Sequence, residues 1–344
     1  MSKKVMVGMS GGVDSAVSVY LLKEAGYDVT GVTLTLHNDN ASDVCDAKKV
    51  AEKIGIPHAA VDFSKNFRET VIADFVECYK KGGTPNPCIT CNKHIKFGDM
   101  LKLALENGMD YIATGHYACV EKNENGRYLL RKSVDLSKDQ TYVLYNLTQE
   151  QLSHVLFPLG GMSKDEARRI AEEQGFVNAH KRDSQDICFV PDGDYSSFIE
   201  AYTGESFPCG DFVDKDGNRL GEHKGIIRYT IGQRKGLGIA LGKPAFVCSK
   251  NVENNTVVIG SNEDLFLTEL TAHNVNLISC DRIDEPMRVC AKVRYNQKEQ
   301  PATVVSIGED KIKVIFDEPQ RAISKGQSVV LYDGDIVVGG GIID

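Results

Sequence analysis

Two stretches of the chain place cysteines where they could do chemistry. Residues 84–93, Thr-Pro-Asn-Pro-Cys-Ile-Thr-Cys-Asn-Lys, predict a rigid loop that leads into a helix. Cys91 lies near the expected start of this helix, where the helix dipole and Lys93 would lower the pKa of a thiol and raise its reactivity. In residues 183–191, Cys188 stands between polar residues and an apolar pair that ends in proline, which indicates a loop or a strand end.

The first pair of cysteines allows other interpretations. Cys88 and Cys91 form a Cys-x-x-Cys pair, which alone is typical of a zinc half-site or a redox pair. A second Cys or His pair is missing at the spacing that a structural zinc site uses. Free cysteines are more often small buried hydrophobic residues, and the remaining ones are expected to be so. These are Cys45, Cys78, Cys119, Cys209, Cys248, Cys280 and Cys290.

A glycine-rich loop near the N-terminus predicts an anion-binding site. Residues 8–15, Gly-Met-Ser-Gly-Gly-Val-Asp-Ser, follow an expected strand at 3–7 and precede a helix. Such a turn gathers backbone N–H groups at the positive end of the helix, and Gly11 and Gly12 permit a close approach of phosphate. Asp14 could hold Mg²⁺ or orient a nucleotide, and the loop lacks the lysine of the usual NTPase loop. The hydroxyl donors are Ser10 and Ser15.

This string resembles the pyrophosphate-binding loop of the ATP pyrophosphatase superfamily. Members split ATP to AMP and pyrophosphate in order to adenylate an oxygen that must leave. The alternative interpretation of the loop is a plain glycine turn in an α/β protein.

The elements that must position these residues alternate in the first half of the chain. Apolar patterns predict strands within 32–36 and 56–63, and a strand that ends in a loop within 111–116, with helices between them. This alternation predicts an α/β fold with a mostly parallel sheet, in which ligands bind at the carboxyl ends of strands. The glycine loop and residues 114–116 both follow such ends.

The second half of the chain has turn signals and short β-rich runs in place of this alternation. Asn125-Gly126 predicts a hairpin, and Ser163 with Glu166 predicts a capping box for a helix that stops at Gly175. Short β-rich runs dominate from residue 256 and favour a small C-terminal β-barrel. The expected domains are an α/β domain at 1–200, a small central β-rich domain at 201–258 and a β-barrel at 259–344. The runs are 256–259, 288–293, 302–307, 311–316 and 328–332.

The composition predicts a cytoplasmic protein with reduced thiols. The chain has 344 residues, of which 42% are hydrophobic, and the apolar runs fall short of the ~18 residues that cross a bilayer. A signal-peptide core is also missing, and the ten cysteines follow no disulfide framework. The net charge of −8 argues weakly against nucleic acid as a partner, but a local basic groove suffices for a specific RNA contact.

Over nearly its whole length the chain resembles the bacterial-type tRNA-specific 2-thiouridylases. The resemblance rests on many motifs in the same order, which makes it far more specific than the glycine loop alone. The matching segments are residues 8–15, 84–87 with 91–97, 113–118, 138–142, 184–191, 230–238, 292–295, 321–323, 326–327 and 332–335. The family has an ATP pyrophosphatase domain, a small central domain and a C-terminal β-barrel, which are therefore expected here.

The resemblance implies a role for each matched residue. Cys91 would be the nucleophile, Cys188 the carrier of a persulfide, and Asp14 a further catalytic group. Leu34, a methionine in many relatives, and Gly115 would flank the adenosine of ATP. The rest of the ATP site would be Gly8, Met9, Ser10, Gly11, Gly12, Val13, Asp14 and Ser15. The target base would meet Asn86, Pro87 and Cys88. Other tRNA contacts would be His116, Lys138, Asp139, Gln140, Arg294, Tyr295 and Gln327.

The implied reaction is ATP- and Mg²⁺-dependent 2-thiolation of the wobble uridine in tRNAs for lysine, glutamate and glutamine. Adenylation turns the uracil 2-oxygen into a leaving group, and persulfide sulfur replaces it, so Cys91 and Cys188 end as a disulfide. An anticodon loop is already single-stranded, so its base reaches a pocket at small cost. The sulfur donor would be a cysteine desulfurase or a sulfur-relay protein.

Three alternatives remain open from the sequence. Some relatives carry aspartate at position 88, so Cys88, Cys91 and Cys188 could instead hold a [4Fe–4S] cluster with one open iron that carries sulfide. A small-molecule ligase of the same superfamily would need no reactive thiols, and loss of Cys188 would leave its activity intact. A non-catalytic RNA-binding module would not exchange pyrophosphate with ATP.

Overall fold

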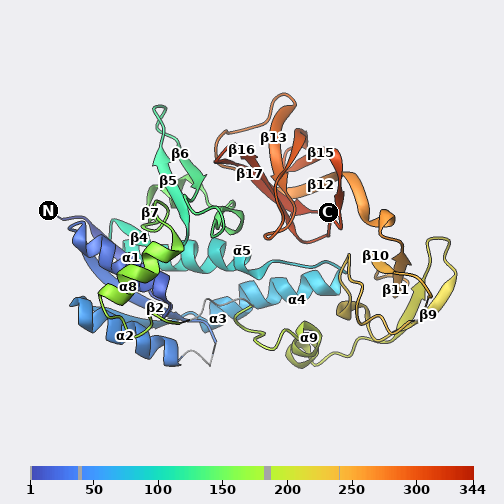
Figure 1. Cartoon of the computed structure of the whole chain (residues 1–344), viewed down its shortest axis with the longest axis horizontal. Helices are drawn as coiled ribbons and strands as arrows, with labels where there is room; N and C mark the ends of the chain where they lie inside the picture. Colours follow the sequence, from blue (N-terminus) through green and yellow to red (C-terminus); the bar gives the residue numbers. More distant parts are fainter. Residues whose placement is uncertain (1, 38–40, 182–186, 240) are drawn as a thin grey trace.

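A computed structural model describes residues 2–37, 41–181, 187–239 and 241–344. The chain forms three bodies along its long axis: an α/β domain at one end, a small β domain at the other, and a β-barrel above the helices that join them (Figure 1). Residues 184–186, part of one matching motif, lie outside the described residues.

The α/β domain is built on a fully parallel sheet, as predicted. Its strand order is β3-β2-β1-β4-β7, and every neighbouring pair is parallel. The central position of β1 places the loop after it beside the ends of β2 and β4. The strands are β1 (Lys4–Gly8), β2 (Asp28–Thr35), β3 (His58–Asp62), β4 (Tyr111–Ala113) and β7 (Val155–Leu156).

Helices cover this sheet and extend beyond it. The capping box at Ser163 and Glu166, at the start of α8, is confirmed. Gly175, with φ +58°, follows the end of this helix. The helices of the domain are α1 (Val13–Glu24), α2 (Ala41–Ile54), α3 (Ser64–Phe67), η1 (Arg68–Ile72), α4 (Ala73–Lys80), α5 (Pro87–Cys91), η2 (Asn92–Asp99), α6 (Met100–Glu106), η3 (Thr141–Val143), α7 (Gln149–Ser153) and α8 (Lys164–Glu173).

The central domain is a four-stranded sheet that packs on α4. Its order is β10-β11-β8-β9, and Phe75 and Tyr79 of α4 share a hydrophobic core with Phe212 and Val257 of the sheet. The joint between the two domains is therefore a continuous apolar core. The elements are α9 (Tyr195–Thr203), β8 (Gly210–Val213), β9 (Arg219–His223), η4 (Ile226–Arg228), β10 (Phe246–Asn251) and β11 (Thr256–Gly260).

The C-terminal barrel has six strands and is closed, because β12 pairs with both β15 and β17. The predicted hairpin at Asn125-Gly126 is confirmed; it joins β5 (Ala118–Lys122) to β6 (Tyr128–Lys132). Ile336 of the barrel pairs with Arg131 of this hairpin, so the first and last domains share a sheet edge. The barrel elements are η5 (Glu263–Leu265), β12 (Phe266–Leu277), β13 (Met287–Lys292), β14 (Gln300–Gly308), β15 (Lys311–Arg321), β16 (Ser328–Asp333) and β17 (Ile336–Ile343).

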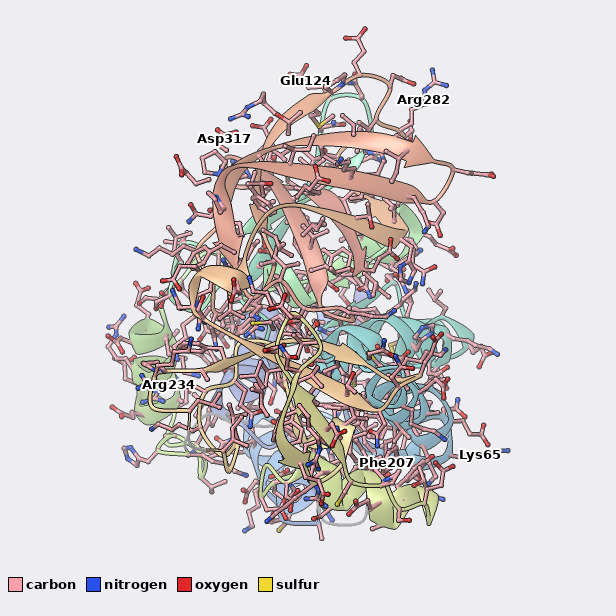
Figure 2. The ribbon with its side chains drawn as sticks, turned by 90° about the vertical axis from the view of Figure 1, so that its right-hand side faces the viewer. Lys65, Glu124, Phe207, Arg234, Arg282 and Asp317 are labelled. Atoms are coloured by element: carbon pink, nitrogen blue, oxygen red, sulfur yellow. The ribbon has the colours of Figure 1, made fainter. Side chains whose placement is uncertain are left out.

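Seen from the end of the molecule, the barrel and the helices occupy opposite sides (Figure 2). Asp317 and Arg282 of the barrel lie at one side, and Lys65 and Phe207 at the other. The predicted domain boundaries at 200/201 and 258/259 fall inside α9 and β11. Within the described residues, no helix is long and apolar enough to span a membrane.

Candidate active site

The glycine loop forms a cradle at the carboxyl edge of the sheet. Gly8 ends β1, Gly11 has φ +70°, and α1 begins at Val13. Among the described residues no acceptor binds the amides of Gly11 and Gly12, so these N–H groups are available to an anion at the helix start. The Ser15 hydroxyl is buried and braces the loop, because it accepts from Ser10 N at 3.2 Å and donates to the carbonyl of Gly12 at 3.1 Å, whereas Ser10 is exposed.

The side chains of the loop divide into two groups. Met9 and Val13 are buried in the core between the sheet and α1, so they offer a ligand only their backbone. Gly115, at the end of β4, touches the loop so closely that a Cβ there would lie 2.8 Å from the carbonyl carbon of Asp14. Leu34, at the end of β2, packs against the cores that contain Ile89 and Cys91, which links the loop's surroundings to the cysteine helix.

The carboxylate of Asp14 is held by a lysine that the sequence analysis missed. Lys164 Nζ lies 2.7 and 2.8 Å from the two carboxylate oxygens, and Tyr117 Oη donates to one of them at 2.9 Å. Lys164 is the first residue of α8, directly after the capping-box serine, and only 5% of it is exposed. A second lysine, Lys181, donates to the carbonyl of Gly11 at 3.3 Å. Lys164 pairs with Asp14, and Lys181 pairs with Asp43 and Asp46, so carboxylates beside the loop balance the charge of both lysines.

Replacing Lys164 with methionine is expected to lower the free energy of unfolding by about 1–3 kcal/mol, because it leaves the half-buried Asp14 carboxylate with one hydroxyl partner. Urea unfolding at neutral pH measures the change. Lys164→Arg keeps the charge and should lose less; equal losses for both variants would contradict an electrostatic cause.

The cysteine helix begins as predicted. Asn86 caps α5, accepting a hydrogen bond from the amide of Cys88 at 3.2 Å, and Pro87 occupies the first helical position. Cys88, Cys91 and Cys188 lie close enough for their charges to interact, and each feels the charge of Lys96. The structure therefore brings the three predicted thiols together, although Cys91 and Cys188 are 97 residues apart in the sequence.

The predicted low pKa of Cys91 is wrong. Cys91 is 8% exposed, and burial raises the pKa of its thiol to about 12. The cation that opposes this shift is Lys96 and not the exposed Lys93. The chain from Asn92 to Asp99 is wound as a π-helix, which brings residues five apart onto one face. Cys88 and Cys188 reach the surface, yet the protein packed around their sulfur atoms still raises the pKa of each thiol.

Alkylation of Cys91 in the free protein is expected to be slow at neutral pH and to rise about tenfold per pH unit up to about pH 10, because a raised pKa keeps the thiolate scarce. An unperturbed thiol levels off above its pKa of about 8.5. Iodoacetamide labelling with peptide mass spectrometry gives the profile. A plateau of the Cys91 rate below about pH 8 would restore the low pKa that the sequence predicted.

Several residues that were expected at the tRNA are engaged inside the protein. His116 is buried, bonds to Thr114 Oγ1 at 2.8 Å and lies against two aromatic rings, a position that does not fit the predicted RNA contact. Gln140 Oε1 accepts from the amide of Tyr117 at 2.9 Å. Asp139 accepts from its own loop and from Thr141. Lys138 is partly exposed.

Two barrel residues that the sequence predicted at the tRNA join domains in this structure. Arg294 donates to the carbonyl oxygens of Ile231 and Ala322 at 3.1 and 2.9 Å. Gln327 donates to the carbonyl of Thr84 at 2.7 Å, and the amide of Thr84 donates to Lys325. The barrel therefore holds the loop that leads to the cysteine helix.

The three thiols do not fit an iron–sulfur cluster as placed. Within the described part of the chain, no group of three His, Cys, Asp or Glu side chains could hold a metal ion. The remaining cysteines are not buried as expected: Cys45 and Cys209 are exposed and the others are half-buried.

Comparisons with known proteins agree with this arrangement. Three family models match in succession: a tRNA methyl transferase HUP domain at 3–192, a tRNA methyl transferase PRC-barrel domain at 196–261 and an aminomethyltransferase beta-barrel domain at 267–343. The tRNA-specific 2-thiouridylase MnmA of Clostridioides difficile (strain 630) is 58% identical over 356 residues, covering 100% of this chain and 99% of that protein.

Two further proteins show the range of the likeness. The tRNA-specific 2-thiouridylase MnmA of Acetivibrio thermocellus is 54% identical and covers 99% of each chain. A solved structure of the U34-tRNA thiolase NcsA from Methanococcus maripaludis with its [4Fe–4S] cluster is 21% identical, covers 59% of this chain and 72% of its own, and has a TM-score of 0.38, so no argument rests on it.

The parallel sheet and its Ser-Gly-Gly loop define a HUP-type domain, which fits the use of ATP. The chain belongs to the tRNA-specific 2-thiouridylase family.

Proposed function

We propose that this protein is an ATP-dependent sulfurtransferase that converts the wobble uridine of tRNAs for lysine, glutamate and glutamine into 2-thiouridine. The observation that carries the proposal is the gathering of Cys88, Cys91 and Cys188, with Cys91 in a core that Leu34, at the end of the strand next to the glycine loop's strand, packs against. A ligase that only adenylates a small molecule has no use for these thiols.

In the proposed reaction the 2-oxygen of uracil attacks the α-phosphorus of ATP, and pyrophosphate leaves. The outer sulfur of a persulfide on Cys188 then attacks carbon 2, and AMP leaves with the oxygen. The Cys91 thiolate attacks the inner sulfur, which forms a Cys91–Cys188 disulfide and releases the thiolated base. A dithiol reductant restores both thiols. Because burial favours the thiol form of Cys91, we propose that Lys96 supports its thiolate at this step.

The cofactor proposals follow from the donor set. ATP would lie with its phosphates on the loop amides and its adenosine between Leu34 and Gly115. Mg²⁺ prefers one or two carboxylates together with phosphate oxygens; Asp14 is the carboxylate of this loop, and because both of its oxygens pair with Lys164 it would have to exchange that lysine for the ion. Bound Mg²⁺ would neutralise phosphate charge as pyrophosphate departs. The described residues do not support the cluster alternative, and we assign it no step.

We further propose a cysteine desulfurase or a sulfur-relay protein as the donor, docking where Cys188 is exposed, and a cytoplasmic location, where thiols stay reduced. We propose that the domain at 1–200 carries out catalysis, that the domain at 201–258 joins the other two, and that the domain at 259–344 contacts the tRNA.

The test is mass spectrometry of anticodon nucleosides after incubation of unmodified tRNA with the protein, ATP, Mg²⁺, a cysteine desulfurase and cysteine. We expect 2-thiouridine at the wobble position and one AMP per thiolated base. Consumption of ATP without 2-thiouridine would refute the proposal. Protein purified without air should show no visible absorbance from an iron–sulfur cluster and should still thiolate tRNA.

A further inference from the structure

The backbone carbonyl of Gly11 receives two side-chain donors. Asn178 Nδ2 donates to its oxygen at 3.1 Å, and Lys181 Nζ donates to the same oxygen at 3.3 Å. Both donors lie in one short segment, residues 176–181, which follows α8. A peptide in the middle of the glycine loop is therefore held by side chains that come from a distant part of the sequence.

The 176–181 segment is anchored in the core. Phe176 and Ala179 are buried in the same hydrophobic core as α1 and α2, and the ring of Phe176 meets that of Tyr20 edge-on, with 6.4 Å between the centres. The amide of Ala179 donates to the carbonyl of Phe176, and the amide of Lys181 donates to that of Asn178. These two successive turns fix the positions from which Asn178 and Lys181 reach the loop.

Helix α2 presses on the same glycine. A Cβ on Gly11 would lie 2.6 Å from the carbonyl oxygen of Asp43, so the loop touches the backbone of α2. Lys181 also pairs with Asp43 at 2.8 Å and with Asp46 at 3.0 Å, which ties the 176–181 segment to this helix. Gly11 thus lies between α2 and the segment, and its peptide has little room to rotate.

The orientation of this peptide determines where the next amide points. In a planar trans peptide the C=O of one residue and the N–H of the next point in opposite directions. Because the Gly11 carbonyl is directed at Asn178 and Lys181, the N–H of Gly12 points away from them, and among the described residues no acceptor binds it. Gly12 is the N-cap of α1, where the positive end of the helix favours an anion.

The other end of the Asn178 amide has no partner. A carbonyl oxygen can only accept, so the amide nitrogen of Asn178 faces Gly11 and Oδ1 lies on the opposite side. Asn178 is 3% exposed, and its buried Oδ1 has no hydrogen-bond partner within the described residues. An unpartnered buried acceptor lowers stability, whereas the Gly11 carbonyl would keep Lys181 as a donor without Asn178. Folding gains little from this asparagine, which favours a role in the loop.

We propose that Asn178 is a positioning residue for ATP. Together with Lys181 it holds the Gly11 carbonyl and so keeps the N–H of Gly12 directed at the phosphates. Without this hold, a pair of glycines, which restricts the backbone least, could turn the peptide over and present its carbonyl oxygen, which repels phosphate. This inference rests on the proposed function, since it concerns the ATP loop of that function.

The first test uses Asn178→Leu, which is similar in size and has no donor. Calorimetry with α,β-methylene-ATP and Mg²⁺ should show binding about tenfold weaker, the effect of one buried hydrogen bond. The melting temperature should not fall, because the unpartnered Oδ1 is removed as well. The KM for ATP in tRNA thiolation should rise, whereas kcat should stay within about twofold. Unchanged affinity would overturn the proposal, and so would a loss of affinity that comes with a lower melting temperature.

The second donor allows a matched comparison. Lys181→Met should also weaken binding, and the double variant with Asn178→Leu should lose more than the product of the two single losses, because either donor alone still holds the carbonyl. Losses that simply multiply would contradict a shared role at this carbonyl.

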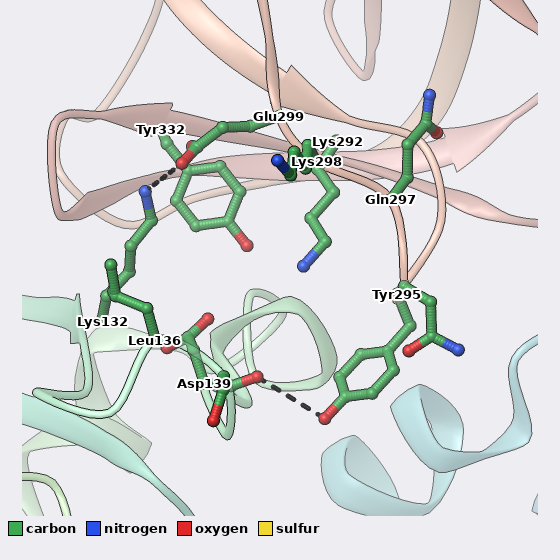
Figure 3. A pocket seen from close by; sticks show the side chains of 11 residues that line it. Lys132, Leu136, Asp139, Lys292, Tyr295, Gln297, Lys298, Glu299 and Tyr332 are labelled. Atoms are coloured by element: carbon green, nitrogen blue, oxygen red, sulfur yellow. Dashed lines mark hydrogen bonds and ion pairs between the residues drawn. The ribbon is translucent and has the colours of Figure 1, made fainter.

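The control is Lys132→Met, which should bind the analogue normally. Lys132 likewise pairs with a carboxylate, that of Glu299, and donates to a backbone carbonyl, that of Gly334. It does so in the pocket between the β5–β6 hairpin and the barrel (Figure 3), and no residue of the glycine loop lines that pocket.

NMR can follow the peptide itself. With ¹³C at the carbonyl and ¹⁵N in every glycine, the selected amides are those of glycines that follow a glycine. Pyrophosphate with Mg²⁺ should shift the Gly12 signal, identified by its loss in Gly12→Ala, and should shift it far less in Asn178→Leu at equal occupancy. An equal shift in both proteins would mean that Asn178 does not orient this peptide, and would refute the proposal. The selected amides belong to Gly12, Gly83, Gly161, Gly340 and Gly341.

These measurements separate the inference from the proposed function. Unaltered protein that binds the analogue but makes no 2-thiouridine would refute the proposed function and leave the role of Asn178 standing. Normal thiolation by the unaltered protein, together with unchanged ATP affinity in Asn178→Leu, would do the reverse.

Discussion

Replacing Cys188 with serine is expected to abolish formation of 2-thiouridine, by at least about 10³-fold, while ATP–pyrophosphate exchange continues. Serine is similar in size to cysteine but cannot carry a persulfide, so the adenylated base would have no sulfur to attack it. Cys188 is exposed, so the change should not disturb the core. Nucleoside mass spectrometry and a parallel exchange assay measure the two half-reactions.

The matched control is Cys209→Ser, which alters another exposed cysteine, in the loop before β8. It should thiolate tRNA at the normal rate. Cys91→Ser should also make no product, yet its Cys188 should still gain one sulfur atom from a desulfurase, visible in the intact mass. Full activity of Cys188→Ser would remove the persulfide route and favour a ligase that needs no thiol.

Replacing Gly115 with alanine should cut ATP-dependent activity about 10²-fold, the scale expected for a displacement of about 1 Å at a reacting group. The added Cβ would lie 2.8 Å from both the carbonyl carbon of Asp14 and the amide of Ser15. Both atoms belong to the backbone at the start of α1, so the loop itself must move. The loss should appear in the KM for ATP and in pyrophosphate exchange.

Gly161→Ala is the control, because a Cβ at Gly161 meets no atom within 4 Å. It should leave the KM for ATP unchanged. Circular dichroism and thermal melting of both variants separate a shifted loop from a general loss of folding. Normal exchange by a folded Gly115→Ala protein would mean that ATP does not occupy this loop.

The sequence predicted those parts of the site that depend on local patterns or on simple topology. Parallel neighbours place their carboxyl ends together, so the loop after β1 and Gly115 after β4 could be brought together although they are 100 residues apart (115 − 15). The capping box at Ser163 is a local hydrogen-bond pattern, which the sequence also predicted.

The parts that the sequence did not predict depend on distant packing. No sequence pattern near Lys164 predicts that its ammonium group pairs with Asp14, which lies 150 residues away. The π-helical winding that selects Lys96 over Lys93 has no signal in residue types. The strand β17 contains three successive glycines, which disfavour strands. At Gly340 a Cβ would lie 2.4 Å from the carbonyl oxygen of Val329 and 2.7 Å from the ring of Tyr145, a close approach that only the fold reveals.

The hydrogen bond from Gln327 to Thr84 has a consequence for synthesis of the chain. Its two residues are 243 positions apart, and a ribosome makes the N-terminal partner first. The parallel sheet and its glycine loop can assemble early, but the loop before Cys88 receives this support only when the barrel is complete. In a nascent or truncated chain the segment that leads to the cysteine helix would therefore lack its barrel contacts until translation has ended.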